Sequence, residues 1–91
     1  MLVQHRYSET DFVAYLLALG FKYDKIETCK STKSGKKTFA YFTGEEEELI
    51  RLQNDFHSGH AIIYALEFAK QRRIVAKKMR ESFIQFKSNN E

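Results

Sequence analysis

Residues 38–49 read TFAYFTGEEEEL, and along them the pattern changes from a β-strand to an α-helix. The TFAYF part combines aromatic side chains with threonine, and both fit the pleated surface of a strand. Phe39 and Tyr41 should point to one face of that strand, and their neighbours to the other. Thr43 and Glu46 then match a capping box, in which two side chains satisfy backbone amides at a helix start. The segment therefore predicts a mixed α+β fold.

The remaining segments complete a single domain over residues 1–91. Apolar residues recur at helical spacing before Gly20, and Gly20 and Gly59 suit helix ends because glycine adopts a positive φ easily. Ser8 or Thr10 can cap the first helix. The expected order is an extended N-terminus over 1–8, a helix over about 9–19, a two-stranded antiparallel hairpin over about 21–42, a helix over about 43–58, a long C-terminal helix over about 60–86 and a frayed tail over 87–91.

The composition is that of a small folded protein in a reducing compartment. The chain has 91 residues, 43% of them hydrophobic and 14% aromatic, which suffices for one packed core and argues against disorder. Cys29 is the single cysteine and cannot form an internal disulfide. No apolar run is long enough for a signal peptide or a membrane span. We therefore expect a cytoplasmic protein that does not contact membranes.

The charge is mildly basic and unevenly distributed. The formal net charge is +3 at pH 7 and the pI is about 9.0, which permits contact with nucleic acid or an acidic partner without requiring either. Basic residues concentrate in 22–37 and in 70–91, and an acidic run occupies 45–48 between them. The two basic zones are therefore the first places to look for a binding surface.

Four cations fall on one face of the predicted C-terminal helix. They are Lys70, Arg73, Lys77 and Arg80, spaced three, four and three residues apart, so they lie within an arc of about 80°. We call them the α-helical basic row. Such a row matches a phosphate backbone, which proteins bind by charge neutralisation and counterion release. The alternative interpretation is the solvated outer face of an amphipathic helix, since Lys and Arg are good helix formers.

The lysines of the predicted turn form a second candidate for nucleic-acid contact. They are Lys33, Lys36 and Lys37, beside Gly35. A lysine-rich turn can follow a backbone, but it also commonly keeps a sheet edge from aggregating. Exposed rings near these lysines could stack on the bases of a single strand, with Tyr23, Tyr41 and Tyr64 as candidates. Core packing is the alternative explanation for each of these rings.

The C-terminal helix also carries a candidate protein interface. Its residues are Arg72, Val75, Met79, Phe83 and Phe86. The apolar members keep a near-heptad spacing, which suits helix pairing in a homodimer. Arg72 interrupts the apolar face, and a buried guanidinium is costly unless it is paired. It could pair with Asp11 or Asp55, reach solvent along its own stem, or border an interface.

Catalytic and metal-binding patterns are not found in the sequence. His57 and His60 are three residues apart near Asp55, but Gly59 indicates a turn between them and no third ligand joins them. There is no nucleophile elbow, ordered Ser-His-Asp set or phosphate-binding loop. The acidic run at 45–48 is explained by a helix start. We therefore expect no enzyme activity, no catalytic residue, no metal and no cofactor.

From Thr10 to about Met79 the chain resembles a family of small uncharacterised domains, of unknown function, found in phages and bacteria. The resemblance rests on TDFVAYLLALG at 10–20, FAYF at 39–42, EL at 48–49, DFHSG at 55–59, and a closing helix with Leu66 and Lys77. It implies the same order of helix, hairpin, helix and helix, and a phage or mobile-element origin. It implies no known activity and assigns no catalytic residues.

Two functional hypotheses follow from these patterns. The first is a nucleic-acid-binding accessory protein that uses the basic face of its C-terminal helix. The alternative is a protein-interaction module that binds a host protein or forms a homodimer through the same helix.

Overall fold

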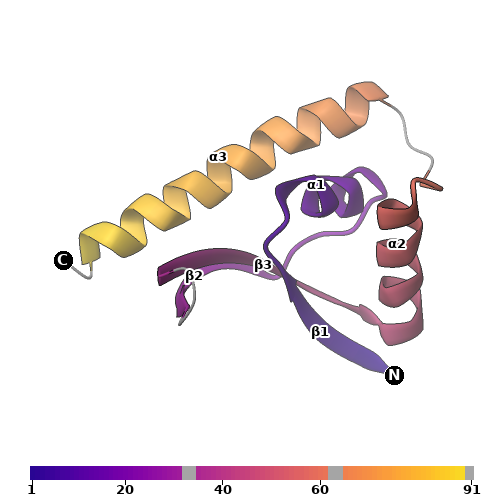
Figure 1. Ribbon diagram of the computed structural model, residues 1–91, viewed down its shortest axis with the longest axis horizontal. Helices are drawn as coiled ribbons and strands as arrows, with labels where there is room; N and C mark the ends of the chain where they lie inside the picture. Colours follow the sequence, from indigo (N-terminus) through magenta and orange to yellow (C-terminus); the bar gives the residue numbers. More distant parts are fainter. Residues whose placement is uncertain (32–34, 62–64, 90–91) are drawn as a thin grey trace.

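The computed structural model describes residues 1–31, 35–61 and 65–89. The elements in chain order are β1 (Leu2–Tyr7), α1 (Thr10–Ala18), β2 (Lys25–Ser31), β3 (Gly35–Glu45), α2 (Glu46–Ser58) and α3 (Ala65–Asn89). The described strands form an antiparallel sheet in the order β1-β3-β2. Figure 1 shows α1 and α3 on the same side of this sheet, with α2 at one end. The mixed α+β class predicted from the sequence is confirmed.

The described sheet has three strands, whereas the sequence predicted a two-stranded hairpin. Residues 1–8, expected as an extended N-terminus and not as part of the sheet, contain β1, which pairs with β3 along its whole length. The Tyr7 side chain at the end of β1 points into the core, is 8% exposed and packs edge-on against Phe12. Since both edges of β3 are paired, β3 is the central strand. The third strand supplies pairing that an isolated hairpin would lack.

The junction between β3 and α2 differs from the predicted capping box, which was wrong. β3 continues to Glu45, and α2 begins at Glu46 with no side-chain hydrogen bond at its N-cap. Thr43 lies in the sheet opposite Gln4, and its hydroxyl donates to Asp24 Oδ2 at 2.6 Å. Because pairing with β1 keeps Thr43 extended, its side chain cannot turn back to cap the helix. The glutamates of the first turn still interact favourably with the helix dipole.

The predicted cap of α1 is also wrong, whereas both predicted glycine stops are confirmed. Glu9 is the N-cap of α1 without a side-chain cap bond, and the Thr10 hydroxyl instead faces Met79 Sδ at 3.7 Å. Gly20 follows α1 with a φ of +104°, and Gly59 follows α2 with a φ of +81°. Other residues would be strained in this backbone conformation.

The hydrophobic core lies between the inner face of the sheet and the helices. Its buried members are Tyr7, Phe12, Val13, Ala14, Tyr15, Leu16, Ala40, Phe42, Leu52, Val75 and Met79. The predicted alternation along β3 is confirmed, because Ala40 and Phe42 are fully buried while Phe39 and Tyr41 point to the opposite face. In β2, the buried Thr28 hydroxyl lies 3.0 Å from the Ser82 hydroxyl of α3. The core and this contact hold α3 against the sheet.

The last helix begins later and ends later than predicted. It starts at Ala65, and it continues to Asn89 through part of the segment expected to be frayed. Arg72 Nε donates to Asp11 Oδ1 at 2.6 Å, so Arg72 has one of the two partners that the sequence suggested. The two side chains are 54% and 48% exposed, which places the pair at the surface. Neither α3 nor another helix among the described residues combines the length and apolar character needed to cross a lipid bilayer.

We expect Met79→Ala to destabilise the fold strongly and Lys77→Ala to leave it almost unchanged. Met79 is 8% exposed within the core, so its truncation should lower the free energy of unfolding by about 2–5 kcal/mol. Lys77 is exposed on the same helix, and its truncation should change that free energy by less than about 0.5 kcal/mol. Urea unfolding followed by circular dichroism measures both. Equal effects of the two substitutions would contradict this orientation of α3.

Candidate functional site

The α-helical basic row lies on the side of α3 that faces away from the core. Val75, between Arg73 and Lys77 in sequence, is 1% exposed and marks the inner side of the helix. At about 100° per residue the row is centred roughly opposite Val75. All four cations are exposed, as expected of an outward face. In the part of the chain that the structure describes, none of them forms an ion pair.

The structure does not bring Lys36 and Lys37 onto one surface with the α-helical basic row. Lys33 lies outside the described residues. Lys36 is on the inner side of the sheet, where its Nζ lies 5.7 Å from the centre of the Phe86 ring of α3. Lys37 is opposite Cys29 in the register and points to the other side of the sheet. Since α3 packs on the inner side and its row faces outward, Lys37 and the row point in opposite directions.

The residues of the candidate protein interface are mostly engaged within the protein itself. Val75 and Met79 are 1% and 8% exposed and belong to its own core, so they offer no surface to a second chain. Arg72 is paired with Asp11. Phe86 is half-buried and has Lys36 beside its ring. Phe83, at 38% exposure, is the member that presents an open apolar surface.

Figure 1 shows one face of the sheet without a described helix over it, and two aromatic rings of β3 are on that face by the alternation of the strand. We call this the outer sheet face. Phe39 and Tyr41 of β3 project from it and are half-buried. The Arg6 guanidinium lies 4.2 Å from the centre of the Phe39 ring, and Lys25 Nζ lies 4.6 Å from that of Tyr41. Each ring is thus joined to a cation from a neighbouring strand.

The sequence indicated only some of these rings and cations. Tyr41 was named as a candidate stacking ring, and the alternation in TFAYF placed Phe39 beside it. Tyr23 packs against the core, and Tyr64 lies outside the described residues. Arg6 and Lys25 were missed because their approach to the rings depends on the pairing of β1 and β2 with β3. Residues so far apart in the sequence form no local pattern that would predict such a contact.

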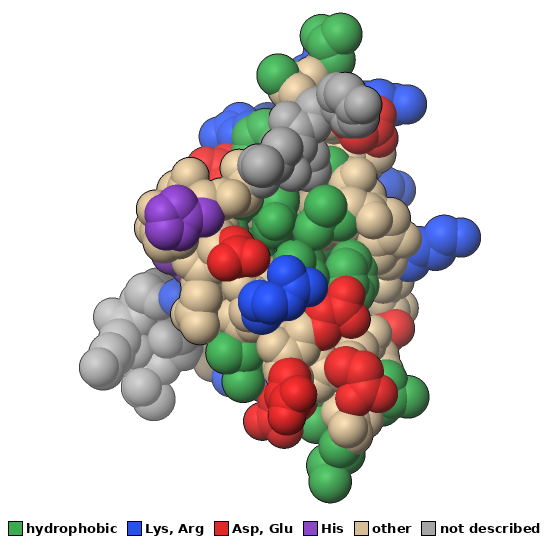
Figure 2. Space-filling view, turned by 90° about the vertical axis from the view of Figure 1, so that its right-hand side faces the viewer, with side chains coloured by type: hydrophobic (Ala, Val, Ile, Leu, Met, Phe, Trp, Pro, Cys, Tyr) green, Lys and Arg blue, Asp and Glu red, His purple; other side chains and the backbone are tan. Residues whose placement is uncertain are grey.

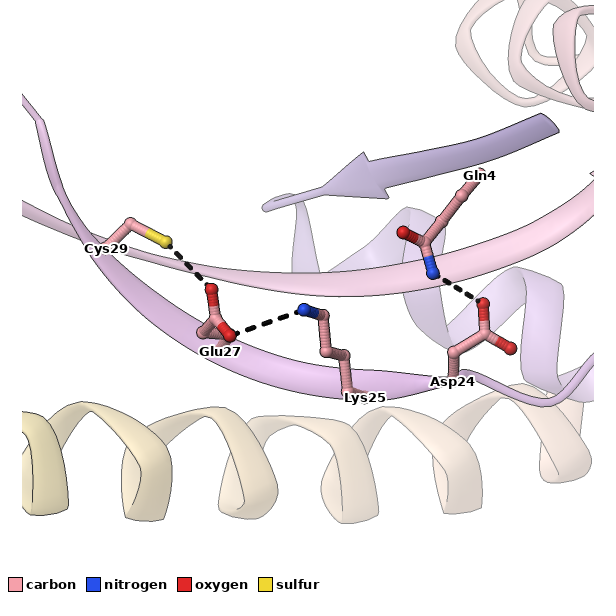
Figure 3. A network of polar contacts seen from close by, with 5 residues as sticks. All are labelled: Gln4, Asp24, Lys25, Glu27 and Cys29. Carbon is pink, nitrogen blue, oxygen red and sulfur yellow. Dashed lines mark hydrogen bonds and ion pairs between the residues drawn. The ribbon is translucent and has the colours of Figure 1, made fainter.

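A network of polar contacts borders the rings along β2 (Figure 3). Lys25 Nζ donates to Glu27 Oε2 at 3.4 Å, and the Cys29 thiol donates to Glu27 Oε1 at 3.5 Å. Gln4 donates to Asp24 at 3.0 Å, beside the hydroxyl of Thr43. The hydrogen bonds from Thr43 and then Gln4 lower the pKa of Asp24 below its ordinary value. The two carboxylates of this network, Asp24 and Glu27, therefore lie on the β2 side of the face.

A cleft of about 400 Å³ between α1 and α2 is a further hollow in the described surface. Its lining is Tyr15, Leu19, Phe21, Glu48, Arg51, Leu52, Asp55, His60 and Ala61. Figure 2 shows the side of the molecule on which α2 lies, where apolar side chains are flanked by charges of both signs and acidic side chains gather. Glu48 and Asp55 on its rim disfavour a polyanion there.

The two histidines that were considered as metal ligands from the sequence have separate partners in the structure. His57 Nε2 lies 2.8 Å from Glu9 Oε2, and its Nδ1 lies 2.9 Å from the Gln53 carbonyl oxygen. Both partners are acceptors, so only the protonated ring can donate to both at once. His60 Nδ1 lies 3.1 Å from the Ser58 hydroxyl. Within residues 1–31, 35–61 and 65–89, no three His, Cys, Asp or Glu side chains group closely enough to hold a metal.

We expect the His57–Glu9 contact to stabilise the fold at low pH and to lose this effect as the pH rises. The hydrogen bond to Glu9 is the main cause that raises the pKa of His57 above its ordinary value of 6.5. A raised folded-state pKa gives stabilisation that is complete below 6.5 and is lost as the pH rises through the folded value. The Tm of wild type and of His57→Gln, measured from about pH 5 to 9, should differ most at the acidic end and converge at the alkaline end.

Glu9→Gln is the matched control, because it removes the carboxylate and keeps the histidine. It should reduce the acid-side stabilisation as His57→Gln does. A constant difference in Tm between wild type and His57→Gln at every pH would contradict the assignment.

Comparisons of the chain with protein-family models, with curated proteins and with solved structures gave no significant match. The resemblance to small phage and bacterial domains therefore stays a prediction from the residues that carry it.

Proposed function

We propose that the protein is a non-enzymatic nucleic-acid-binding accessory domain that contacts the phosphate backbone through the α-helical basic row. The observation that supports this most directly is the outward orientation of the row. Its four side chains are exposed and, among the described residues, unpaired with carboxylates. Cations already neutralised by neighbouring carboxylates would gain less from a phosphate.

The dimensions of the row suit a nucleic-acid strand. Lys70 and Arg80 are separated by about 15 Å along the helix axis, at about 1.5 Å per residue. A duplex rises about 3.4 Å per nucleotide of each strand, so the row is about as long as four base-pair steps. The binding would be independent of base sequence, because it reads the backbone.

The charge of the remaining surface also favours binding on the α3 side of the molecule. α3 carries seven Lys or Arg against Glu67 and Glu81, and Glu67 accepts a hydrogen bond from Gln71. The first turn of α2 carries Glu46, Glu47 and Glu48, which would repel a polyanion. The field of the protein therefore steers nucleic acid towards α3. Within this proposal the protein acts in the cytoplasm and has a phage or mobile-element origin.

We expect binding to a fluorescein-labelled DNA duplex of about 20 base pairs to weaken with salt, and Lys77→Gln/Arg80→Gln to make that dependence shallower. Each lost phosphate contact should reduce the slope of log K against log salt by about 0.9, so the double variant should lose about 1.8 units of slope. Fluorescence anisotropy at several salt concentrations measures the slope.

The matched control is Lys22→Gln/Lys30→Gln, which removes the same charge from exposed positions outside the row. Its slope should stay close to that of wild type. If the control loses as much slope as the row variant, or if wild type does not bind at low salt, the proposed role of the row is overturned.

A second candidate function is association with another protein, either a host protein or a second copy of this chain. It is favoured by two apolar side chains on the outward face of α3, Leu66 and Ile84, which are 89% and 56% exposed. They lie on the side of the helix that carries the basic row, by helical periodicity. Phe83, at 38% exposure, lies about 100° around the helix from Ile84, so it is not part of this surface.

For the self-association form of this proposal we expect Leu66→Gln/Ile84→Gln to convert a dimer into a monomer without loss of helix content. Both side chains are exposed, so their replacement should affect the fold little. Light scattering coupled to size-exclusion chromatography gives the mass, and far-UV circular dichroism gives the helix content. A wild type that is monomeric at high concentration rules out this form.

A further inference from the structure

We propose that the outer sheet face binds single-stranded nucleic acid, with Phe39 and Tyr41 stacking on two bases and with Arg6 and Lys37 contacting the backbone. The inference takes its ligand class from the proposed function but rests on different residues. The α-helical basic row faces outward from α3, and α3 packs on the inner side of the sheet. The outer sheet face is therefore on the opposite side of the molecule.

The first support is that this face is open to a ligand. Gln4, Arg6 and Lys25 on the strands that flank β3 are exposed. α1 and α3 both lie on the other side of the sheet (Figure 1), and among the described residues no helix packs over the rings. A large aromatic side chain on a strand is usually buried. Two partly exposed rings on one open face therefore offer flat apolar surface to a ligand.

The second support is the pairing of each ring with a cation. Arg6 lies over Phe39 at 4.2 Å and Lys25 over Tyr41 at 4.6 Å. Lys37 stands on the same face of β3, two residues before Phe39. A base that stacks on the face of either ring that its cation covers would displace that cation, which could then contact a phosphate. Nucleic acid is the polymer that carries both groups at every unit.

The third support concerns spacing and favours a single strand over a duplex. Side chains two residues apart on a strand are separated by about 6.6 Å. Stacked bases in a duplex rise about 3.4 Å per nucleotide. Adjacent bases can cover both Phe39 and Tyr41 only when the strand is extended and its bases are unstacked. Single strands adopt such a form, because their bases can be splayed out.

The charge distribution on this face sets the side along which the backbone would run. Glu27 and Asp24 lie on the β2 side and are engaged by Lys25, Gln4 and Thr43. Arg6 lies on the β1 side of the rings, away from these carboxylates, and Lys37 lies near the start of β3, diagonally across from Glu27. A backbone that runs along the β1 side past Arg6 would avoid the carboxylates, and Lys37 could meet it near the start of β3. The charged rim also suits an anionic ligand better than an apolar protein surface.

The test compares wild type with Phe39→Ile/Tyr41→Ile, which removes the rings and keeps the strand preference of the residues. Binding of fluorescein-labelled oligo(dT) and oligo(rU) of about ten nucleotides should weaken about tenfold or more, because stacking contributes strongly for each base. Binding of a duplex should stay within about twofold of wild type, since the α-helical basic row is intact. Phe39→Tyr/Tyr41→Phe is the matched control, and it should keep wild-type affinity for the oligonucleotides.

The outcomes separate this inference from the proposed function. Oligonucleotide binding that is unaffected by the isoleucine variant overturns the inference and leaves the role of the basic row intact. The inference is supported if oligonucleotide binding weakens in the isoleucine variant and not in Lys77→Gln/Arg80→Gln. This holds even if Lys77→Gln/Arg80→Gln also leaves duplex binding unchanged, which would count against the proposed function alone. A wild type that binds no oligonucleotide at low salt overturns the inference, and duplex binding then decides the proposed function alone.

A second measurement covers the case in which the isoleucine variant does not fold, which circular dichroism would show. Oligo(dT) is titrated into ¹⁵N-labelled wild type and amide shifts are recorded. Shifts concentrated in β1 and β3, at residues 4–6 and 37–43, support the inference. Shifts confined to α3 or to α2 overturn the inference.

Discussion

The packing of Val75 and Met79 against α1 and the sheet is the interaction on which the rest of the structure depends. Both side chains are almost fully buried, and they fix the rotation of α3 about its own axis. Because a helix has about 3.6 residues per turn, burial of these two positions turns the α-helical basic row outward. It also leaves Phe83 and Ile84 partly uncovered near the end of the helix. The same contacts therefore set both the core and the surface that α3 presents.

The sheet imposes the second constraint. Its inner face is covered by helices, and the described part of the chain provides no helix for the outer face. An antiparallel sheet with one exposed face normally carries polar residues there. Here Phe39 and Tyr41 of the central strand occupy that face, held beside Arg6 and Lys25. A departure from the usual pattern at one place, in a sheet that otherwise follows it, is expected at a functional surface.

Structural features were predicted correctly from the sequence where their cause lies in neighbouring residues. The glycine stops after α1 and α2 and the alternation of side chains along β3 depend on single residues or on neighbours. The pairing of Arg72 with Asp11 was among the suggested alternatives, because a cation on an apolar face needs a carboxylate within reach. The third strand and the absence of a capping box at α2 were not predicted. They depend on β1 pairing with a strand more than thirty residues away in sequence, and that pairing keeps Thr43 in the sheet.

The sequence by itself determined the class of the fold, the long basic helix and the common face of Lys70, Arg73, Lys77 and Arg80. These follow from the periodicity and composition of contiguous residues, which hold wherever the segment lies. Only the tertiary structure decided that this face turns away from the core, that Lys37 points the opposite way, and that Arg6 and Lys25 meet the rings of Phe39 and Tyr41. Those relations are set by strand register and by which side of a helix is buried. Both are chosen by the free energy of the whole packed domain, because burying apolar surface rewards one arrangement of segments that are distant in the chain.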